Sequence, residues 1–192
     1  MGVHRGTIGA MLLALTVATT AAAQLPAQGP VQAPVTYRLT FPEPEHRWMQ
    51  VEVLLTELPT APLDLHMSRA SPGRYALHDF AKNVYDVRIT DTAGSALAVT
   101  RPTPQRWEVV RHPSAVRVSY RVFGDRTDGT YLSIDSTHAH INMPSALMWA
   151  RGLEERPVSV TFEPPAASAW KVATQLFPGP DARTFTAPNL QY

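Results

Sequence analysis

The chain has 192 residues, no cysteine, 18 prolines and a formal net charge of +1. This length fits one domain or two small ones, and the lack of cysteine excludes thiol catalysis, thiolate metal sites and disulfides. The small net charge excludes nucleic-acid binding driven by a concentrated basic surface, so we expect no nucleic-acid partner.

Residues 1–23 have the pattern of an export signal. Arg5 precedes an apolar run over residues 8–17, and Ala21, Ala22 and Ala23 give the small-x-small pattern that signal peptidase cuts. The run is shorter than the ~20 apolar residues that a permanent membrane-spanning helix needs, and no later run approaches that length, so we expect no stable membrane anchor. The sequence therefore predicts an exported protein, periplasmic or extracellular.

Residues 24–34 are rich in proline, glutamine and alanine, which predicts a flexible spacer. From residue 35 onward, apolar and polar residues alternate with a period of two, which places one strand face on a core and the other in water. The alternating runs are residues 35–41, 48–55, 84–89, 107–109, 116–122, 131–134, 158–162 and 170–172. Proline and glycine separate the runs at short intervals. We therefore predict that residues 35–192 form one all-β domain, an antiparallel β-sandwich.

Helical patterns are short and few. Residues 77–82 favour one or two helical turns, and residues 144–150 begin with Pro144 at a suitable first helical position. No second hydrophobic periodicity requires a separate domain.

The usual catalytic motifs are missing from the sequence. It contains no His-Glu-x-x-His, no Gly-x-Ser-x-Gly and no glycine-rich phosphate loop, so we name no catalytic residue. The best candidates for metal ligands are His138 and His140, because residues i and i+2 of a strand share one face. Asp135 or His112 would supply a third ligand. The alternative interpretation is a pair of exposed histidines at a strand end.

Tryptophans suggest a different kind of site. Exposed aromatic side chains suit carbohydrate platforms, and the four candidates are Trp48, Trp107, Trp149 and Trp170. Alternation around Trp107 and Trp170 favours a place in the core for these two.

Residues 68–84 contain Pro72-Gly73, Tyr75, Asp79 and Phe80-Ala81 in an order that resembles a known family. The stretch looks like the N-terminal domain of the glycyl aminopeptidases, which are PDZ-containing gluzincin metallopeptidases. Further similar segments are residues 107–109, 116–122, 141–147, 158–165 and 170–174. The resemblance extends from about residue 35 to residue 192.

The central motif also has a physical interpretation of its own. Pro72 fixes φ and Gly73 tolerates positive φ, which together predict a tight type II turn. Tyr75 and Phe80 are then expected to pack the following segment onto the sheet, and Asp79 to cap a short helix. This segment is either a conformational staple or a rim loop at an interface with a neighbouring catalytic domain.

The resemblance implies a β-rich N-terminal domain that precedes a thermolysin-like catalytic domain and a PDZ domain. In the family, zinc is held by His-Glu-x-x-His and a downstream glutamate, so zinc is expected only in the catalytic domain and no cofactor in this chain. The chain is then expected to be an N-terminal piece (a truncated product, a fragment or a split subunit) whose partner is a catalytic metallopeptidase domain, in cis or on a separate chain. Its implied role is that of a non-catalytic accessory domain that shapes the cleft. The alternatives are a free-standing module that binds glycan or peptide, and a small metalloenzyme built on His138 and His140.

Overall fold

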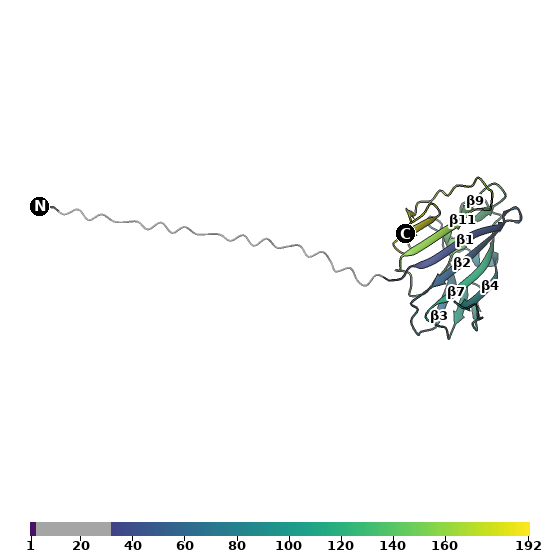
Figure 1. The fold of residues 1–192 in the computed structure, drawn as a ribbon, viewed down its shortest axis with the longest axis horizontal. Coiled ribbons are helices and arrows are strands. Elements are labelled where there is room, and N and C mark those ends of the chain that lie inside the picture. Colours follow the sequence, from purple (N-terminus) through teal and green to yellow (C-terminus); the bar gives the residue numbers. More distant parts are fainter. Residues whose placement is uncertain (3–31) are drawn as a thin grey trace. The chain divides into compact units, whose positions relative to one another are not determined.

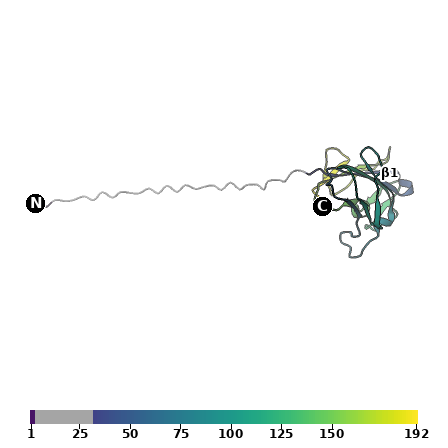
Figure 2. The same cartoon turned by 90° about the horizontal axis from the view of Figure 1, so that it is seen from below.

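The computed structural model of the chain describes residues 1–2 and 32–192, and the chain divides into two units, Met1–Val31 and Gln32–Tyr192. Residues 3–23 of the predicted export signal (1–23) and residues 24–31 of the predicted spacer (24–34) lie outside the described residues. All elements below belong to Gln32–Tyr192. In both views of Figures 1 and 2, the C-terminus lies close to the point where this unit begins.

Two larger sheets and one small sheet account for the strands of this unit. The seven-stranded sheet has the order β12 (Phe177–Pro178), β13 (Thr184–Ala187), β11 (Val158–Glu163), β1 (Val35–Glu43), β2 (Trp48–Leu55), β7 (Val116–Phe123) and β4 (Val84–Asp91). The four-stranded sheet has the order β10 (Met148–Ala150), β3 (Leu63–Met67), β6 (Arg106–Val109) and β5 (Thr100–Thr103). The small sheet pairs β8 (Leu132–Ile134) with β9 (Ala139–Ile141). Figure 1 shows β11, β1, β2, β7 and β4 side by side in that order.

Alternation in the sequence explains which faces are buried. In β2 every second residue is buried, and β7 follows the same rule, with Val51 opposite Tyr120 and Val53 opposite Val118. Apolar side chains from the seven-stranded and four-stranded sheets, among them Leu39, form one continuous core. The all-β class predicted from the sequence is therefore confirmed.

One strand pair departs from the predicted antiparallel arrangement. β1 and β11 are parallel, with Val35 opposite Val158 and Leu39 opposite Phe162. Every other pair in the three sheets is antiparallel. A parallel pair needs a long crossover connection, which here is formed by all the strands between β1 and β11.

The helical elements are shorter than the sequence pattern indicates. α1 (Met143–Ala146) is a single turn with proline in its first positions, as predicted, but the chain then becomes strand β10 instead of continuing as helix to residue 150. The predicted turn at 77–82 is a 3-10 helix, η2 (Phe80–Asn83), and a second 3-10 helix, η1 (Pro44–His46), follows β1. Residues 170–172 lie outside the strands, and the Trp170 ring instead packs edge-on against Phe41 with centroids 5.2 Å apart.

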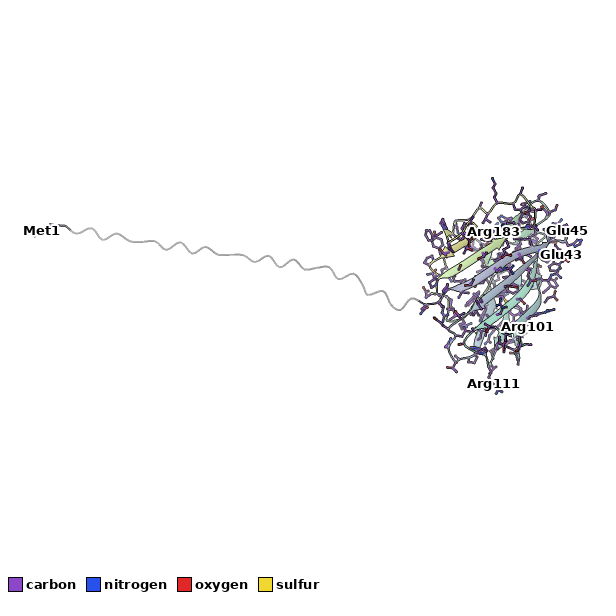
Figure 3. All side chains as sticks on the ribbon, in the orientation of Figure 1. Met1, Glu43, Glu45, Arg101, Arg111 and Arg183 are labelled. Carbon is purple, nitrogen blue, oxygen red and sulfur yellow. The ribbon has the colours of Figure 1, made fainter. Side chains whose placement is uncertain are left out.

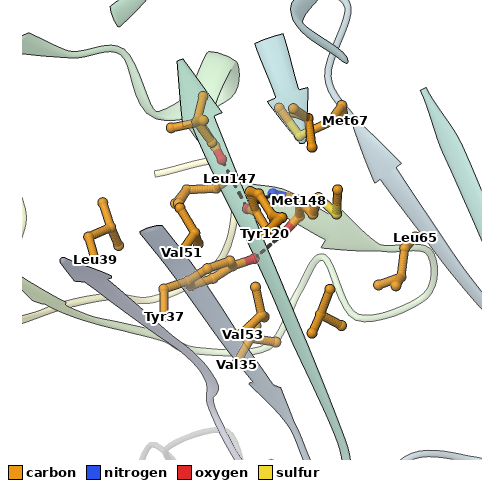
Figure 4. Close-up of a cluster of buried hydrophobic side chains, with 14 of the residues drawn as sticks. Val35, Tyr37, Leu39, Val51, Val53, Leu65, Met67, Tyr120, Leu147 and Met148 are labelled. Atoms are coloured by element: carbon orange, nitrogen blue, oxygen red, sulfur yellow. Dashed lines mark hydrogen bonds between the residues drawn. The ribbon is translucent and has the colours of Figure 1, made fainter. Parts of the chain in front are cut away.

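Two buried tyrosines hold the chain where α1 gives way to β10. The Tyr37 hydroxyl donates to the Met148 carbonyl at 2.8 Å, and the Tyr120 hydroxyl donates to the Ala146 carbonyl at 2.9 Å. The Met148 N–H in turn donates to the Tyr120 oxygen at 2.8 Å. Figure 4 shows both rings reaching from β1 and β7 to this segment. The hydroxyls thus supply partners that a neighbouring strand would otherwise provide.

No helix among residues 1–2 and 32–192 is long and apolar enough to cross a membrane.

Candidate functional site

The Pro72-Gly73 turn forms as the sequence predicts. Gly73 has φ of +73°, and the Arg74 N–H donates to the Ser71 carbonyl at 3.0 Å across the two central residues. Positive φ at the third position with proline at the second is the geometry of a type II turn. This turn reverses the chain in the connection between β3 and η2, which we call the rim loop (residues 68–79).

The base of the rim loop is fixed by hydrogen bonds. The His78 N–H donates to the Arg69 carbonyl at 2.8 Å, which closes the loop on itself. The Ser71 hydroxyl is buried and accepts from the side-chain amide of Asn142 at 3.0 Å, and the same amide donates to the Thr130 carbonyl. Asn142 precedes α1, so the loop is tied directly to the segment that the two tyrosines hold.

The tip of the rim loop is apolar and exposed. Tyr75 is 106% exposed and Leu77 is 73% exposed, so the prediction that Tyr75 packs onto the sheet is wrong. The hydrogen bonds of the loop are made on either side of Tyr75 and Leu77, by Arg74 and His78. Two large apolar side chains are thus exposed within three residues of this loop, which makes the tip a candidate surface for contact with another protein domain.

Phe80 has the packing role that the sequence assigns to it. Its ring is fully buried, stacks on His78 with centroids 5.1 Å apart, and meets Tyr131 edge-on at 5.0 Å. Asp79 occupies the N-cap position of η2, but its side chain makes no capping hydrogen bond, which corrects the capping prediction. Its backbone carbonyl instead accepts from the Lys82 N–H at 3.4 Å, the spacing of a single 3-10 turn.

Tyr131 makes contacts that the sequence pattern did not predict. Its ring lies under the Arg126 guanidinium at 4.3 Å and the Lys82 ammonium at 5.6 Å, besides packing on Phe80. Cations over an aromatic face are attracted by the negative face of the ring. These contacts attach η2 and the start of β8 to one another beneath the rim loop.

A turn at Asp128 supports the tip from the side. Its carboxylate accepts the N–H groups of Thr130 at 2.9 Å and Tyr131 at 3.2 Å, while its carbonyl accepts from the Arg74 guanidinium at 3.1 Å. The hydrogen bond from Thr130 is the main reason that the pKa of Asp128 lies below its ordinary value, and the Arg126 charge adds to it. The Asp128-Gly129-Thr130 sequence is a turn signal that would have located this support.

Among the described residues, no group of three possible ligands forms around the two histidines with metal-ligand spacing. His138 precedes β9 and His140 lies within it, and both are exposed. Asp135 accepts from the Thr137 hydroxyl at 2.6 Å and from the N–H groups of Thr137 and His138, and these bonds lower the pKa of Asp135 to about 2. The ring nitrogens of His112 lie 2.8 Å from the carbonyl of the neighbouring Pro113 and 2.9 Å from the carbonyl of Ala61.

Among residues 1–2 and 32–192, no group of three or more His, Asp or Glu side chains could hold a metal ion. A catalytic zinc needs three protein ligands, so the described residues do not fit the zinc that the resemblance implies. The interpretation of His138 and His140 as the centre of a small metalloenzyme therefore has no third ligand.

Residues 36–192 match the family model described as the peptidase M61 N-terminal domain. The chain belongs to the peptidase M61 family. The match covers all strands from β1 to β13 except the first residue of β1, together with the rim loop. No curated protein matches the chain significantly.

A solved structure shows the same fold. An aminopeptidase N family protein from Idiomarina loihiensis superposes with a TM-score of 0.75 at 23% identity, over 82% of the present chain. The peptidase M61 chain spans 27% of the length of that protein. An M1 zinc metallopeptidase from Deinococcus radiodurans has a TM-score of 0.38 at 15% identity, covering 80% of this chain and 37% of its own length.

Proposed function

We propose that this peptidase M61 chain is a non-catalytic accessory domain of an exported zinc aminopeptidase. In this role the domain packs against a catalytic metallopeptidase domain, in cis or on a separate chain, and narrows the mouth of its cleft. The family match over residues 36–192 supports the choice of partner. The signal-like pattern in residues 1–23 supports a periplasmic or extracellular location.

The observation that carries the proposal is the exposed apolar tip of the rim loop. Tyr75 and Leu77 are the large apolar side chains with the greatest exposure in residues 32–192. Burial of one such side chain contributes about 1.5–3 kcal/mol to association. Aromatic anchors of this kind are enriched among the residues that dominate interface energies.

The fixed base of the loop makes the tip an efficient contact. Ser71 and Arg74 are hydrogen-bonded to Asn142 and Asp128, and the His78 N–H closes the loop onto the Arg69 carbonyl, so the tip is held in position before a partner arrives. A loop that is already ordered loses little conformational entropy on binding, which leaves more of the burial energy for affinity.

Peptide hydrolysis itself is assigned to the catalytic domain. When bound there, zinc would polarise the scissile carbonyl and activate water. The present chain contributes binding surface, orientation and exclusion of water at the cleft mouth. Purified on its own, it should not hydrolyse aminoacyl substrates.

The proposal is tested by co-expression with the catalytic region of a peptidase M61 relative made without its own N-terminal domain. We expect the two chains to co-purify and to hydrolyse aminoacyl anilides together. The double substitution Tyr75→Ser, Leu77→Ser should abolish co-purification and leave the circular dichroism spectrum unchanged. Val110→Ser is the matched control, because Val110 is 55% exposed and lies after β6, away from the rim loop in sequence. Hydrolysis by the present chain alone, or equal co-purification by the double variant, would contradict the proposal.

A second candidate function is that of a secreted module that binds glycan. It is favoured by a group of aromatic rings on the outer face of the seven-stranded sheet.

A further inference from the structure

An open hollow of about 290 Å³ lies on the outer face of the seven-stranded sheet, away from the core. It is lined by Trp48, Tyr85, Asp86, Arg121 and Phe123. The strand register brings these residues together, because Trp48 of β2 lies opposite Phe123 of β7 and Tyr85 of β4 lies opposite Arg121. The hollow therefore spans three adjacent strands at one edge of the sheet.

Three aromatic rings form the walls of the hollow. Trp48 meets Tyr85 edge-on, with centroids 5.2 Å apart and planes at 89°, and meets Phe123 at 5.1 Å and 60°. Tyr85 is 47% exposed. Because the rings are held by one another at defined angles, they present a fixed apolar surface instead of a set of independent side chains.

Arg121 is the positive group of the hollow, and it is held on three sides. Its guanidinium lies 4.1 Å from the Trp48 ring centroid, donates to Glu43 at 2.8 Å, and lies 3.7 Å from the Asp86 carboxylate. Figure 3 places Glu43 at one end of the domain, far from Arg111. A guanidinium has five N–H donors, so these contacts leave donors for a ligand.

Asp86 reaches the hollow from a strained backbone. Its φ is +53°, and the pairing of β4 with β7 changes register between Tyr85 and Arg88, which marks a β-bulge. A non-glycine residue at positive φ costs of the order of 1–3 kcal/mol, and such strain concentrates at ligand sites. Bulges redirect a side chain that would otherwise follow the alternation of the strand. Here the bulge sets an exposed carboxylate beside Arg121 and the aromatic walls.

Charge decides which ligand the hollow suits. An anion gains little, because Glu43 and Asp86 already oppose the charge of Arg121. A cation gains nothing from the Trp48 face, because Arg121 already occupies it. A neutral molecule with one apolar face and several hydroxyl groups meets neither obstacle.

We propose that this hollow binds a neutral carbohydrate. The C–H face of a sugar ring packs on the exposed ring of Tyr85, one hydroxyl donates to the Asp86 carboxylate, and a neighbouring hydroxyl accepts from Arg121. The volume is close to the lower end of the roughly 300–1,000 Å³ range of small-ligand sites, which suits a short stretch of a glycan chain. This activity goes beyond the accessory role, because it would attach the exported domain to a glycan surface.

Isothermal titration of the purified chain with cellotetraose, chitotetraose, mannotetraose and maltotetraose tests the proposal. We expect at least one of the four to bind with micromolar to millimolar affinity. Tyr85→Ala and Asp86→Gly should each weaken that binding at least about tenfold. Asp86→Gly is informative because glycine accepts positive φ, so the variant should melt at the same or a higher temperature while it loses the sugar.

Tyr75→Ala provides the matched control, since it removes an exposed tyrosine of the rim loop and should leave sugar binding unchanged. Tyr85→Ala in turn should leave co-purification with the catalytic region unchanged, which separates this proposal from the accessory role. The carbohydrate proposal is overturned if none of the four sugars binds, or if binding survives both hollow substitutions. Binding of inorganic phosphate or tetramethylammonium in place of the sugars would also overturn it.

Discussion

The substitution Tyr120→Phe tests how the two sheets are joined at the start of β10. Tyr120 is fully buried, and its hydroxyl both accepts the Met148 N–H at 2.8 Å and donates to the Ala146 carbonyl at 2.9 Å. Phenylalanine keeps the ring and its packing but removes both hydrogen bonds. Tyr37→Phe is the natural comparison, because the Tyr37 hydroxyl contacts only the Met148 carbonyl among the hydrogen bonds of the described residues.

The expected loss follows from what each substitution leaves unpaired. An unsatisfied buried polar group costs about 1–3 kcal/mol. Tyr120→Phe leaves the Met148 N–H and the Ala146 carbonyl unpaired, so we expect a loss of about 2–4 kcal/mol in the free energy of unfolding. Tyr37→Phe leaves only the Met148 carbonyl without this donor, and that oxygen has a second lone pair. We therefore expect a loss of about 0.5–1.5 kcal/mol in the free energy of unfolding.

Urea denaturation followed by tryptophan fluorescence measures both losses, provided that the slope against urea is unchanged. For a domain of this size each kcal/mol corresponds to about 2–4 °C in melting temperature, so the two variants should separate clearly. If Tyr120→Phe lost no more stability than Tyr37→Phe, the hydroxyls would not be the partners of the β10 backbone, and the reasoning would fail.

The remaining predictions concern pH and glycine. Asp128 and Asp135 have pKa values below their ordinary ones in the folded state, so their stabilising effect is present above a pH of about 4 and is lost as the pH falls toward 2. The two buried tyrosines have raised pKa values because burial disfavours the charged form, so stability should fall as the pH rises above about 10. Melting temperatures between these extremes should form a plateau, and a protein equally stable at pH 2 and pH 7 would contradict the assignment. Gly124→Ala would bring a Cβ within 2.9 Å of the Leu132 Cβ, and this overpacking should cost about 1–3 kcal/mol of unfolding free energy. In Gly129→Ala the new Cβ meets nothing within 4 Å, but the residue keeps φ of +72°, so the variant should lose about 1 kcal/mol of unfolding free energy. If Gly129→Ala lost more stability than Gly124→Ala, backbone strain would outweigh crowding.

The sequence predicted the long strands because their period is local. β2 and β7 each alternate over eight residues, and the faces that alternation assigns to the core are the buried ones. The parallel pairing of β1 with β11 was not predictable in this way. Val35 and Val158 are far apart in sequence, and nothing in either strand's own pattern specifies the direction of its partner.

Short strands were missed where tertiary contacts override the local pattern. Residues 148–150 continue a helical pattern from Pro144, yet they form β10, which pairs with β3 through Met148 opposite Met67. The partners that stabilise this strand, the hydroxyls of Tyr37 and Tyr120, lie more than 25 residues away in sequence. A helix that continued past Ala146 would have left both buried hydroxyls without these acceptors.

Only the local features of the candidate sites were predictable from the sequence. The Pro72-Gly73 turn is a two-residue signal, and it forms. The exposure of Tyr75 depends on the contacts at the loop base, from Asn142 and Asp128, which belong to distant segments. The hollow depends on strand register and on a bulge in β4, neither of which a single sequence displays.

The outer face of the seven-stranded sheet carries two kinds of side chain, ion-paired ones and aromatic ones, and the aromatic ones line the hollow. Elsewhere on this face several outward residues are charged and paired, as Arg38 is with Glu163 at 2.6 Å and with Glu52 at 3.5 Å. Exposed ion pairs contribute little to stability, about 0–1 kcal/mol, so they serve mainly to keep the face in water. At the edge near β4 the same alternation instead places Trp48 and Phe123 outward. The fold does not need aromatic rings there, because a polar pair would occupy the same positions without exposing apolar surface. Their presence, together with a carboxylate that a strained backbone places 3.7 Å from Arg121, is what we expect of a binding site and not of a solvated sheet face.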